Sequence, residues 1–341
     1  MSKKVVTMGE MMLRLMPKGN LRLEQATSFD AYYGGDESIV AVSLAKFGFH
    51  SVFASKLPDN PLGRTAAAKL VEQGVDTSQI AWGGERFGLN FYESGASVRP
   101  SRVLYDRKYS AISQANAADF DFESIFCAAD WFHVSGITPA ISDAAAKLTE
   151  DAMKAAKKHS VTVSMDLNYR SKLWSPEKAQ SVMIPLMQYV DVCIGGIEDA
   201  QKVLGMPCTS KDMDRGEIDI EAYKDMFQQL KHTFQFQYIA TTLRRSISAS
   251  VNDWSSLIYH ENEFFHTPKY QIHIVDRGGG GASFSAGVIY GILNGFNLET
   301  IGRFATAASA LKQTIPGDFN LVTADEVFAL MNGDGSGRIQ R

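Results

Sequence analysis

The sequence has few cysteines and no long apolar segment. Cys127, Cys193 and Cys208 are the three cysteines among 341 residues, and their spacing matches neither a disulfide framework nor a metal site. No run of 18 apolar residues occurs, so we expect no membrane-spanning helix. Glu10 and Arg14 interrupt the apolar start, which argues against a signal peptide. These features predict a cytoplasmic protein with reduced, buried thiols.

Long basic runs and paired histidines are also missing. The net charge is −4 and the isoelectric point is near 6.0, which argues against a nucleic-acid partner. The seven histidines do not fall at metal-ligand spacing. The sequence is 45% apolar, and a chain of this length can bury a large core. We therefore expect a globular protein that binds neither nucleic acid nor membrane.

Short β-rich segments alternate with longer helical patterns along most of the chain. Residues 3–10 and 51–58 have the composition of strands, and the pattern of 37–49 between them is helical. A longer helix is predicted over 143–161, with Ser142 as its N-cap. This alternation predicts an α/β fold with a mainly parallel sheet and helices on both of its faces.

Two segments depart from this alternation. Residues 11–34 and 86–113 alternate between apolar and polar residues, as antiparallel strands do, around turn-forming glycine and proline. We interpret residues 1–341 as one domain with a small β-sheet lid, formed by about 11–34 and 86–113, that could exclude water from a reaction. The alternative is an exposed β flap used only for dimer packing, and both roles are compatible.

Four consecutive glycines mark the most informative segment, "IVDRGGGGASFSAG" at 274–287. A glycine-rich turn between a strand and a helix exposes backbone N–H groups, and the N-terminus of the helix adds partial positive charge. The pattern is neither a dinucleotide-binding fingerprint nor a Walker loop, because the required glycine and Gly-Lys-Ser/Thr are missing. We interpret it as an anion site; the alternative is a flexible turn that needs positive φ.

Several motifs follow one another along the chain. They are "YYGGDESIVAVSLAKFG", "LPDNPLGR", "GLNFYE", "RPSRVLYDR", "DLNYRSKLW", "CIGGIEDAQKVLG", "TTLRRSISAS", "DRGGGGASFSAG" and "ALKQTIPGDF". In their order and spacing the sequence is similar to the ribokinase-type (PfkB) sugar kinases, and within them to the 2-keto-3-deoxygluconate kinases. The resemblance implies a ribokinase-like α/β fold, a homodimer formed through the lid, and transfer of a phosphoryl group from ATP with Mg²⁺ to a sugar-acid hydroxyl.

The resemblance also implies roles for individual residues. Two arginines in one pocket would suit a sugar acid, because guanidinium binds carboxylate and keto oxygens directionally; the alternative for each is a structural bond to a neighbour. The sugar-binding residues implied are Gly34, Gly35, Asp36, Tyr105, Arg107 and Arg170. Those implied for ATP are Asp199, Thr242, Arg244, Gly279, Gly281 and Gln313, with Gly279, Gly280 and Gly281 as the anion hole beside the catalytic position 282.

The same motifs contain several departures from the family pattern. Ala282 stands where the family has its catalytic aspartate, and losing a general base costs about 10²–10⁴-fold in rate. Gly196 replaces an asparagine associated with Mg²⁺, Ile39 a pocket asparagine, and Gln313 a common histidine. Three hypotheses follow: an impaired sugar-acid kinase, a catalytically silent protein that binds a sugar acid or nucleotide, or a kinase with another substrate. Because pocket changes alone do not account for Ala282, the third ranks lowest.

Overall fold

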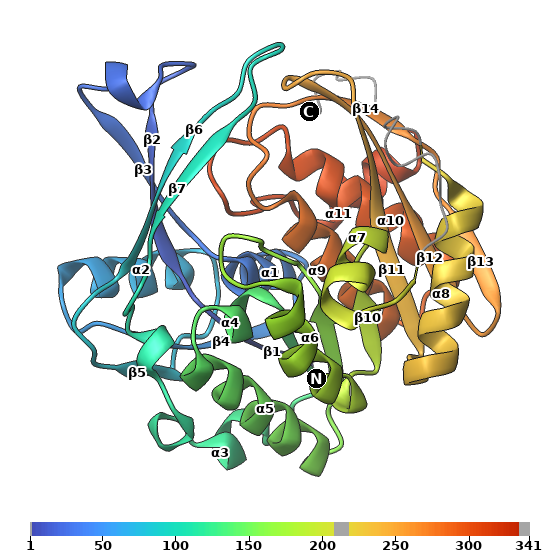
Figure 1. Ribbon diagram of the computed structural model, residues 1–341, viewed down its shortest axis with the longest axis horizontal. Helices are drawn as coiled ribbons and strands as arrows, with labels where there is room; N and C mark the ends of the chain where they lie inside the picture. Colours follow the sequence, from blue (N-terminus) through green and yellow to red (C-terminus); the bar gives the residue numbers. More distant parts are fainter. Residues whose placement is uncertain (1, 208–217, 334–341) are drawn as a thin grey trace.

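A large twisted sheet runs through the centre of the molecule, with helices on both sides and a small second sheet projecting from one end (Figure 1). The computed structural model describes residues 2–207 and 218–333. Cys208, one of the three cysteines, therefore lies outside the described residues. Among the described residues, no helix is long and apolar enough to cross a membrane, as the sequence predicts.

The central sheet is parallel through most of its width. Strands β5, β4, β1, β8, β9, β10 and β11 pair in parallel, and β12 then pairs antiparallel with β11, β13 and β14. The strands are β1 (Lys4–Met8), β4 (His50–Leu57), β5 (Ile80–Trp82), β8 (Trp131–Ser135), β9 (Thr162–Asp166), β10 (Val192–Ile194), β11 (Tyr238–Ser246), β12 (Val251–His260), β13 (Glu263–His266) and β14 (Tyr270–His273).

Helices cover both faces of the sheet, so strand side chains alternate between two cores. In β1, Val6 and Met8 belong to one apolar cluster and Val5 to the other, as the alternation of side chains along a strand requires. One cluster includes α3, α5, α6, α7 and α8, and the other α1, α9, α10 and α11. The α-helices of the described residues are α1 (Asp36–Lys46), α2 (Pro61–Glu72), α3 (Phe122–Phe126), α4 (Ile137–Ala140), α5 (Asp143–Lys158), α6 (Pro176–Leu186), α7 (Ile197–Leu204), α8 (Ile220–Phe234), α9 (Gly280–Leu293), α10 (Leu298–Lys312) and α11 (Ala324–Met331).

Side-chain caps explain where several helices begin. The hydroxyl of Ser142 accepts a hydrogen bond from the backbone N–H of Ala145 at 3.0 Å, which confirms the predicted N-cap of α5. The helix after the glycine run begins earlier than its composition suggests. Its first residue is Gly280, so the glycines themselves form the N-terminus of α9 rather than a separate turn before it.

The second sheet is built from the two segments that alternate in the sequence. Its strand order is β3-β2-β6-β7, with β2 (Met12–Pro17), β3 (Phe29–Gly34), β6 (Gly88–Glu93) and β7 (Arg102–Asp106). In register across three strands, Arg14, Asn90 and Tyr105 lie on one face. On the other face lie the residues next to these in sequence, Leu15, Phe91 and Leu104, because neighbouring residues of a strand point to opposite faces. One face of this sheet is therefore polar and the other apolar. We call the sheet the lid.

Candidate active site

A large cavity opens at the carboxyl ends of the parallel strands. Its volume is about 820 Å³. Asp166 ends β9 and Ile194 ends β10, and both line it, as do the first residues of α1, α7 and α9. In open α/β sheets this edge is where ligands bind, because strand ends and helix N-termini converge there. The cavity therefore lies where the fold favours a small-molecule site.

The glycine run forms one wall of the cavity. Gly279 has a φ of 79°, the left-handed region, and caps α9. A Cβ atom on Gly281 would meet no heavy atom within 4 Å, so this residue faces open space. The first N–H groups of an α-helix have no partner inside the helix and attract anions. The start of α9 is thus shaped to receive a phosphate or carboxylate.

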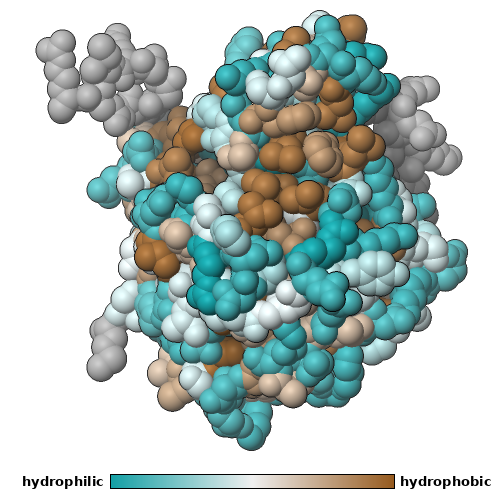
Figure 2. All heavy atoms as spheres, turned by 90° about the vertical axis from the view of Figure 1, so that its left-hand side faces the viewer, coloured by the Kyte–Doolittle hydropathy of each residue, from teal (hydrophilic) through white to brown (hydrophobic). Residues whose placement is uncertain are grey.

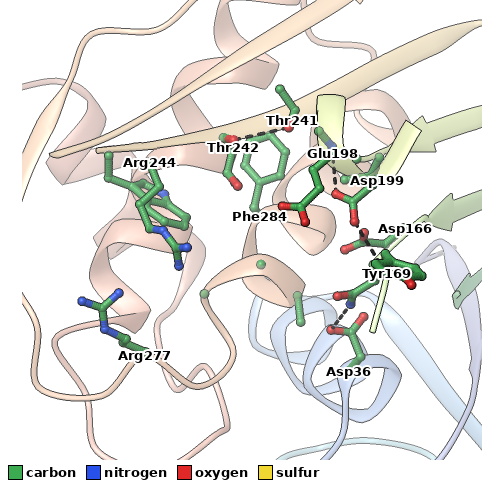
Figure 3. Close-up of a pocket in the computed structure, with 18 of the residues that line it drawn as sticks. Asp36, Asp166, Tyr169, Glu198, Asp199, Thr241, Thr242, Arg244, Arg277 and Phe284 are labelled. Atoms are coloured by element: carbon green, nitrogen blue, oxygen red, sulfur yellow. Dashed lines mark hydrogen bonds between the residues drawn. The ribbon is translucent and has the colours of Figure 1, made fainter. Parts of the chain in front are cut away.

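Carboxylates gather at one end of the cavity (Figure 3). Asp36, Asp166, Glu198 and Asp199 lie there together, contributed by α1, β9 and α7. Burial raises the pKa of Asp166 well above its usual range, and the neighbouring charges of Asp36 and Asp199 raise it further. Burial also raises the pKa of Asp36, although the charge of Arg170 and a hydrogen bond from Asn168 oppose this. We call this group the acidic end.

Two arginines lie at the opposite end (Figure 3). Arg244 projects from β11, and Arg277 precedes the glycine run. An Nη atom of Arg277 donates to the carbonyl oxygens of Ser248 and Ala249 at 3.1 and 2.9 Å, which holds its guanidinium at the rim. The start of α9 lies between these arginines and the acidic end. The cavity therefore has a cationic end and a carboxylate-rich end on either side of an anion-binding helix terminus.

Ten of the residues implied by the sequence line this cavity. They come from β11, α1, α7, the start of α9 and the loops after β9 and α10, which are far apart in the chain. Their ligand roles stay predictions. The ten are Asp36, Arg170, Asp199, Thr242, Arg244, Gly279, Gly280, Gly281, Ala282 and Gln313.

Arg107 does not line the cavity, contrary to the expected reach from the lid. Its Nε donates to Glu10 Oε2 at 2.7 Å, and Glu10 Oε1 accepts from the hydroxyl of Ser110 at 2.5 Å. Arg107 and Glu10 are 8% and 3% exposed, and a buried carboxylate needs such a partner. The structure therefore shows Arg107 in a structural bond, the alternative to a ligand role, and its partner is Glu10. Tyr105 stays on the lid, 41% exposed, with its ring 5.4 Å from the guanidinium carbon of Arg107.

Gly34 and Gly35 also lie outside the cavity lining. A Cβ atom on Gly34 would meet the side chain of Asp318 at 2.5 Å, and one on Gly35 would collide with the backbone carbonyl of Glu10. These glycines therefore allow β3 and the start of α1 to pack closely against their neighbours. Ile39, expected at a pocket position, is 5% exposed and belongs to the apolar cluster beneath α9, together with Ala282.

Comparison with known proteins identifies the family. The sequence profile of the pfkB family carbohydrate kinases matches residues 2–322. The chain belongs to this family. The chain is 32% identical over 338 residues to a 2-dehydro-3-deoxygalactonokinase from Haloferax volcanii, and the match covers 99% of each chain.

Solved structures agree with this assignment and with the ribokinase-like fold. A 2-dehydro-3-deoxygluconokinase from Thermotoga maritima matches with a TM-score of 0.94 and 48% identity, over 97% of this PfkB kinase and 100% of the other chain. A putative 2-keto-3-deoxygluconate kinase from Enterococcus faecalis matches with a TM-score of 0.91 and 28% identity, over 100% and 99%. The predicted family, fold class and resemblance to 2-keto-3-deoxygluconate kinases are therefore confirmed.

Several cavity residues were not singled out from the sequence, among them four polar or aromatic ones. Asp166 and Asn168 stand at the end of β9 and just after it, and Arg277 lies inside the glycine motif. The sequence signal available for Asp166 and Asn168 was the pair of polar residues in "MDLN", at the end of an apolar strand. Trp254, on β12, also lines the cavity, and the strand that carries it was itself missed.

Two glycines of the site are expected to respond differently to substitution. A Cβ atom on Gly196 would lie 3.5 Å from Thr241 Oγ1 with no closer contact, and this residue caps α7. Because asparagine caps helices well, Gly196→Asn is expected to change the unfolding free energy by only a few tenths of a kcal/mol. Gly279→Ala is expected to cost more than about 1 kcal/mol, because φ is positive and its Cβ would collide with the carbonyl of Asp318. Urea denaturation of both variants checks this, and equal losses would contradict it.

Proposed function

We propose that the chain transfers the γ-phosphoryl group of ATP to a hydroxyl of a 2-keto-3-deoxy sugar acid, at a rate lowered by Ala282. The observation that carries this proposal is the N-terminus of α9, whose glycines open onto one cavity between carboxylates and arginines. Phosphoryl transfer relies mainly on positioning and on neutralising charge at the transferred group. A helix N-terminus between two differently charged ends can supply both.

The nucleotide end of the proposed site is the cationic one. Arg244 and Thr242 on β11 line the cavity, and Arg277 approaches from the loop before α9. Guanidinium groups suit phosphate oxygens because they donate in pairs. Gln313 packs against Gly280, where a Cβ atom would lie 3.3 Å from its Cγ. These residues would bind ATP, with its γ-phosphate at the start of α9.

Mg²⁺ would be held at the acidic end. Asp199 Oδ1 accepts from the backbone N–H of Tyr169 at 2.9 Å, and Oδ2 from that of Gly196 at 3.1 Å. These bonds fix the carboxylate and leave lone pairs on both oxygens. Among the described residues no three acidic, histidine or cysteine side chains form a metal cage. This suits Mg²⁺, which is commonly held by one or two carboxylates, here Glu198 and Asp199, together with substrate phosphates whose charge it neutralises.

Arg170 is the residue proposed for the acid group of the sugar. It follows β9, lines the cavity and is exposed, and its Nη1 donates to the carbonyl of Tyr169 at 3.0 Å. Unlike Arg107, it has no carboxylate within ion-pair distance among the described residues. Its guanidinium therefore keeps donors for a substrate carboxylate.

ADP formation with MgATP tests the proposal. Each of 2-dehydro-3-deoxygluconate and 2-dehydro-3-deoxygalactonate is supplied, with fructose as the neutral-sugar control. We expect turnover that depends on a sugar acid and falls below the ordinary kinase range of about 1–100 s⁻¹. ADP formation that no sugar acid stimulates would contradict the kinase proposal.

A catalytically silent homologue is the second candidate, and Ala282 with Gly196 favours it. Calorimetry with each sugar acid and with ATP separates the two functions. Binding of a sugar acid without ADP formation would support a sensing or regulatory role, whereas turnover excludes it.

We also propose that two copies of the chain associate through the apolar face of the lid. Leu15, Phe29, Phe91 and Leu104 lie on this face, and Leu104 is 58% exposed. Figure 2 looks at this side of the molecule, and apolar side chains gather in its upper half. A sheet face of this kind favours a self-complementary contact, because the same residues meet across a two-fold axis.

The dimer predicts that Leu104→Lys lowers the mass seen by analytical ultracentrifugation from dimer to monomer. A lysine on each copy would place like charges in an apolar contact. Ile184→Lys is the control, since Ile184 on α6 is also an exposed apolar residue, and the apolar cluster that includes α6 contains no lid residue. Equal behaviour of the two variants would argue against the lid as the dimer contact.

A further inference from the structure

Asp36 has an unusual carboxylate within the acidic end. It is the first residue of α1, and its Oδ1 accepts a hydrogen bond from Asn168 Nδ2 at 3.1 Å. Its Oδ2 is buried and has no hydrogen-bond partner in the structure. A buried carboxylate oxygen without a partner is costly, so it calls for an explanation. A substrate hydroxyl that donates to Oδ2 would supply one.

The packing of α1 against α9 brings Asp36 close to the glycine run. Ile39 is one turn further along α1, and its Cγ2 lies 3.3 Å from where a Cβ atom on Gly279 would be. Residues three apart in a helix share a face, and one turn rises about 5.4 Å. Asp36 and the start of α9 therefore line the same cavity, as Figure 3 shows.

Asp199 and Glu37, two other carboxylates of this region, are more fully engaged in hydrogen bonds than Asp36. Both oxygens of Asp199 accept backbone hydrogen bonds. Glu37 Oε1 accepts from Ser135 and from the hydroxyl of Thr138 at 2.7 Å, below the cavity rather than in its lining. Glu198 is exposed, beside the proposed Mg²⁺ position. Asp36 combines a free buried oxygen with a place next to the anion-binding helix.

We propose that Asp36 is the general base of this chain and takes the proton that Ala282 cannot accept. The inference rests on the proposed kinase function. As the sugar oxygen attacks the γ-phosphorus of ATP, its O–H bond breaks and the proton moves to Asp36 Oδ2. The new O–P bond forms, the bond from phosphorus to the bridging oxygen breaks, and ADP leaves with that electron pair. Asp36 afterwards releases its proton to water.

The surroundings of Asp36 suit this role. A general base works best when its pKa approaches the operating pH, and burial raises the pKa of this carboxyl from its ordinary acidic value. The charge of Arg170 acts in the opposite direction and favours the carboxylate form. Asp36 is thus a stronger proton acceptor than a surface aspartate.

A double-mutant cycle tests the assignment. Turnover is measured for the unmodified chain, Asp36→Asn, Ala282→Asp and the double variant, and sugar-acid affinity is measured by calorimetry without ATP. We expect Asp36→Asn to lower kcat by about 10²-fold or more in the unmodified chain. In the Ala282→Asp background it should change kcat by less than about threefold, because the carboxylate introduced at position 282 then accepts the proton. Sugar-acid affinity should fall by a similar factor in both backgrounds, because the substrate hydroxyl loses the same hydrogen-bond acceptor in each.

Two further variants serve as a repeat of the substitution and as a control. Asp36→Ala repeats the substitution without an amide that could form new bonds, and its effect on kcat should match that of Asp36→Asn. Asp225→Asn removes an exposed carboxylate of α8 outside this cavity and should leave kcat unchanged.

The possible contrary results point to different errors. An equal loss of kcat in both backgrounds, or a loss of sugar-acid binding that accounts for it, would overturn the role of Asp36 as base. Turnover by Ala282→Asp together with none by the unmodified chain would also overturn it, while leaving the proposed kinase function standing. No turnover by any variant with either sugar acid would contradict both proposals.

Discussion

Replacing Ala282 with aspartate is expected to raise kcat for sugar-acid phosphorylation by about 10²–10⁴-fold. Position 282 is the third residue of α9, lines the cavity and is 1% exposed. A carboxylate there would lie beside the anion-binding N–H groups and next to the proposed γ-phosphate position. Because Asp36 already accepts the proton in the unmodified chain, the gain should fall near the lower end of this range. Steady-state ADP formation under saturating MgATP measures it.

The substitution should weaken the fold only in part. Burying a carboxylate at a 1%-exposed position of an apolar cluster costs free energy, and the positive end of the helix dipole offsets about 0.3–1 kcal/mol of that cost. Ala282→Asn is the matched control, because it has the same shape without a proton-accepting charge. Equal kcat values for the aspartate and asparagine variants would refute the missing-base explanation. An unchanged kcat for both would mean that Gly196 or another departure limits the reaction.

The fold was largely predictable because its main signals are local. Alternating strand and helix patterns set the parallel sheet, and Ser142 fixed the start of α5. The antiparallel strands β12, β13 and β14 were missed. β12 pairs with β11, β13 and β14 and packs against α10, and no local pattern records these partners. The lid could be found because its two segments alternate between apolar and polar residues around turn-forming glycine and proline.

The site was predictable in part, for a physical reason. Residues that follow strands or begin helices converge at one sheet edge, so Asp199, Arg170 and the glycine run were placed in one cavity. The direction of a long side chain was not predictable. Arg107 turns to the buried carboxylate of Glu10, a partner 97 residues away, rather than to the cavity. Asp166 was overlooked because the end of a buried strand resembles core until its neighbours are known.

Replacing Arg14 with methionine is expected to cost about 3–5 kcal/mol of unfolding free energy, because it leaves buried charges unpaired. Arg14 lies on lid strand β2, its side chain is 4% exposed, and its Nη1 is 3.1 Å from Asp276 Oδ1 and 2.9 Å from Asp318 Oδ1. The rings of Tyr32 and Tyr92 each lie 5.1 Å from its guanidinium carbon. Equilibrium denaturation in urea measures the loss.

This ion-pair cluster also fixes the entry to the glycine run, so the same substitution should raise KM for ATP. Asp276 accepts hydrogen bonds from the backbone N–H groups of Gly278 at 2.9 Å and Gly317 at 3.0 Å. Without Arg14, repulsion between Asp276 and Asp318 would loosen both loops.

Arg303→Met is the control for the unfolding free energy: its exposed pair with Glu299 on α10 should be worth less than about 1 kcal/mol. A loss from Arg14→Met no larger than the control's would refute the cluster's role. A smaller loss is expected for Arg14→Met with Asp276→Asn, since removing both charges leaves less uncompensated charge in the protein.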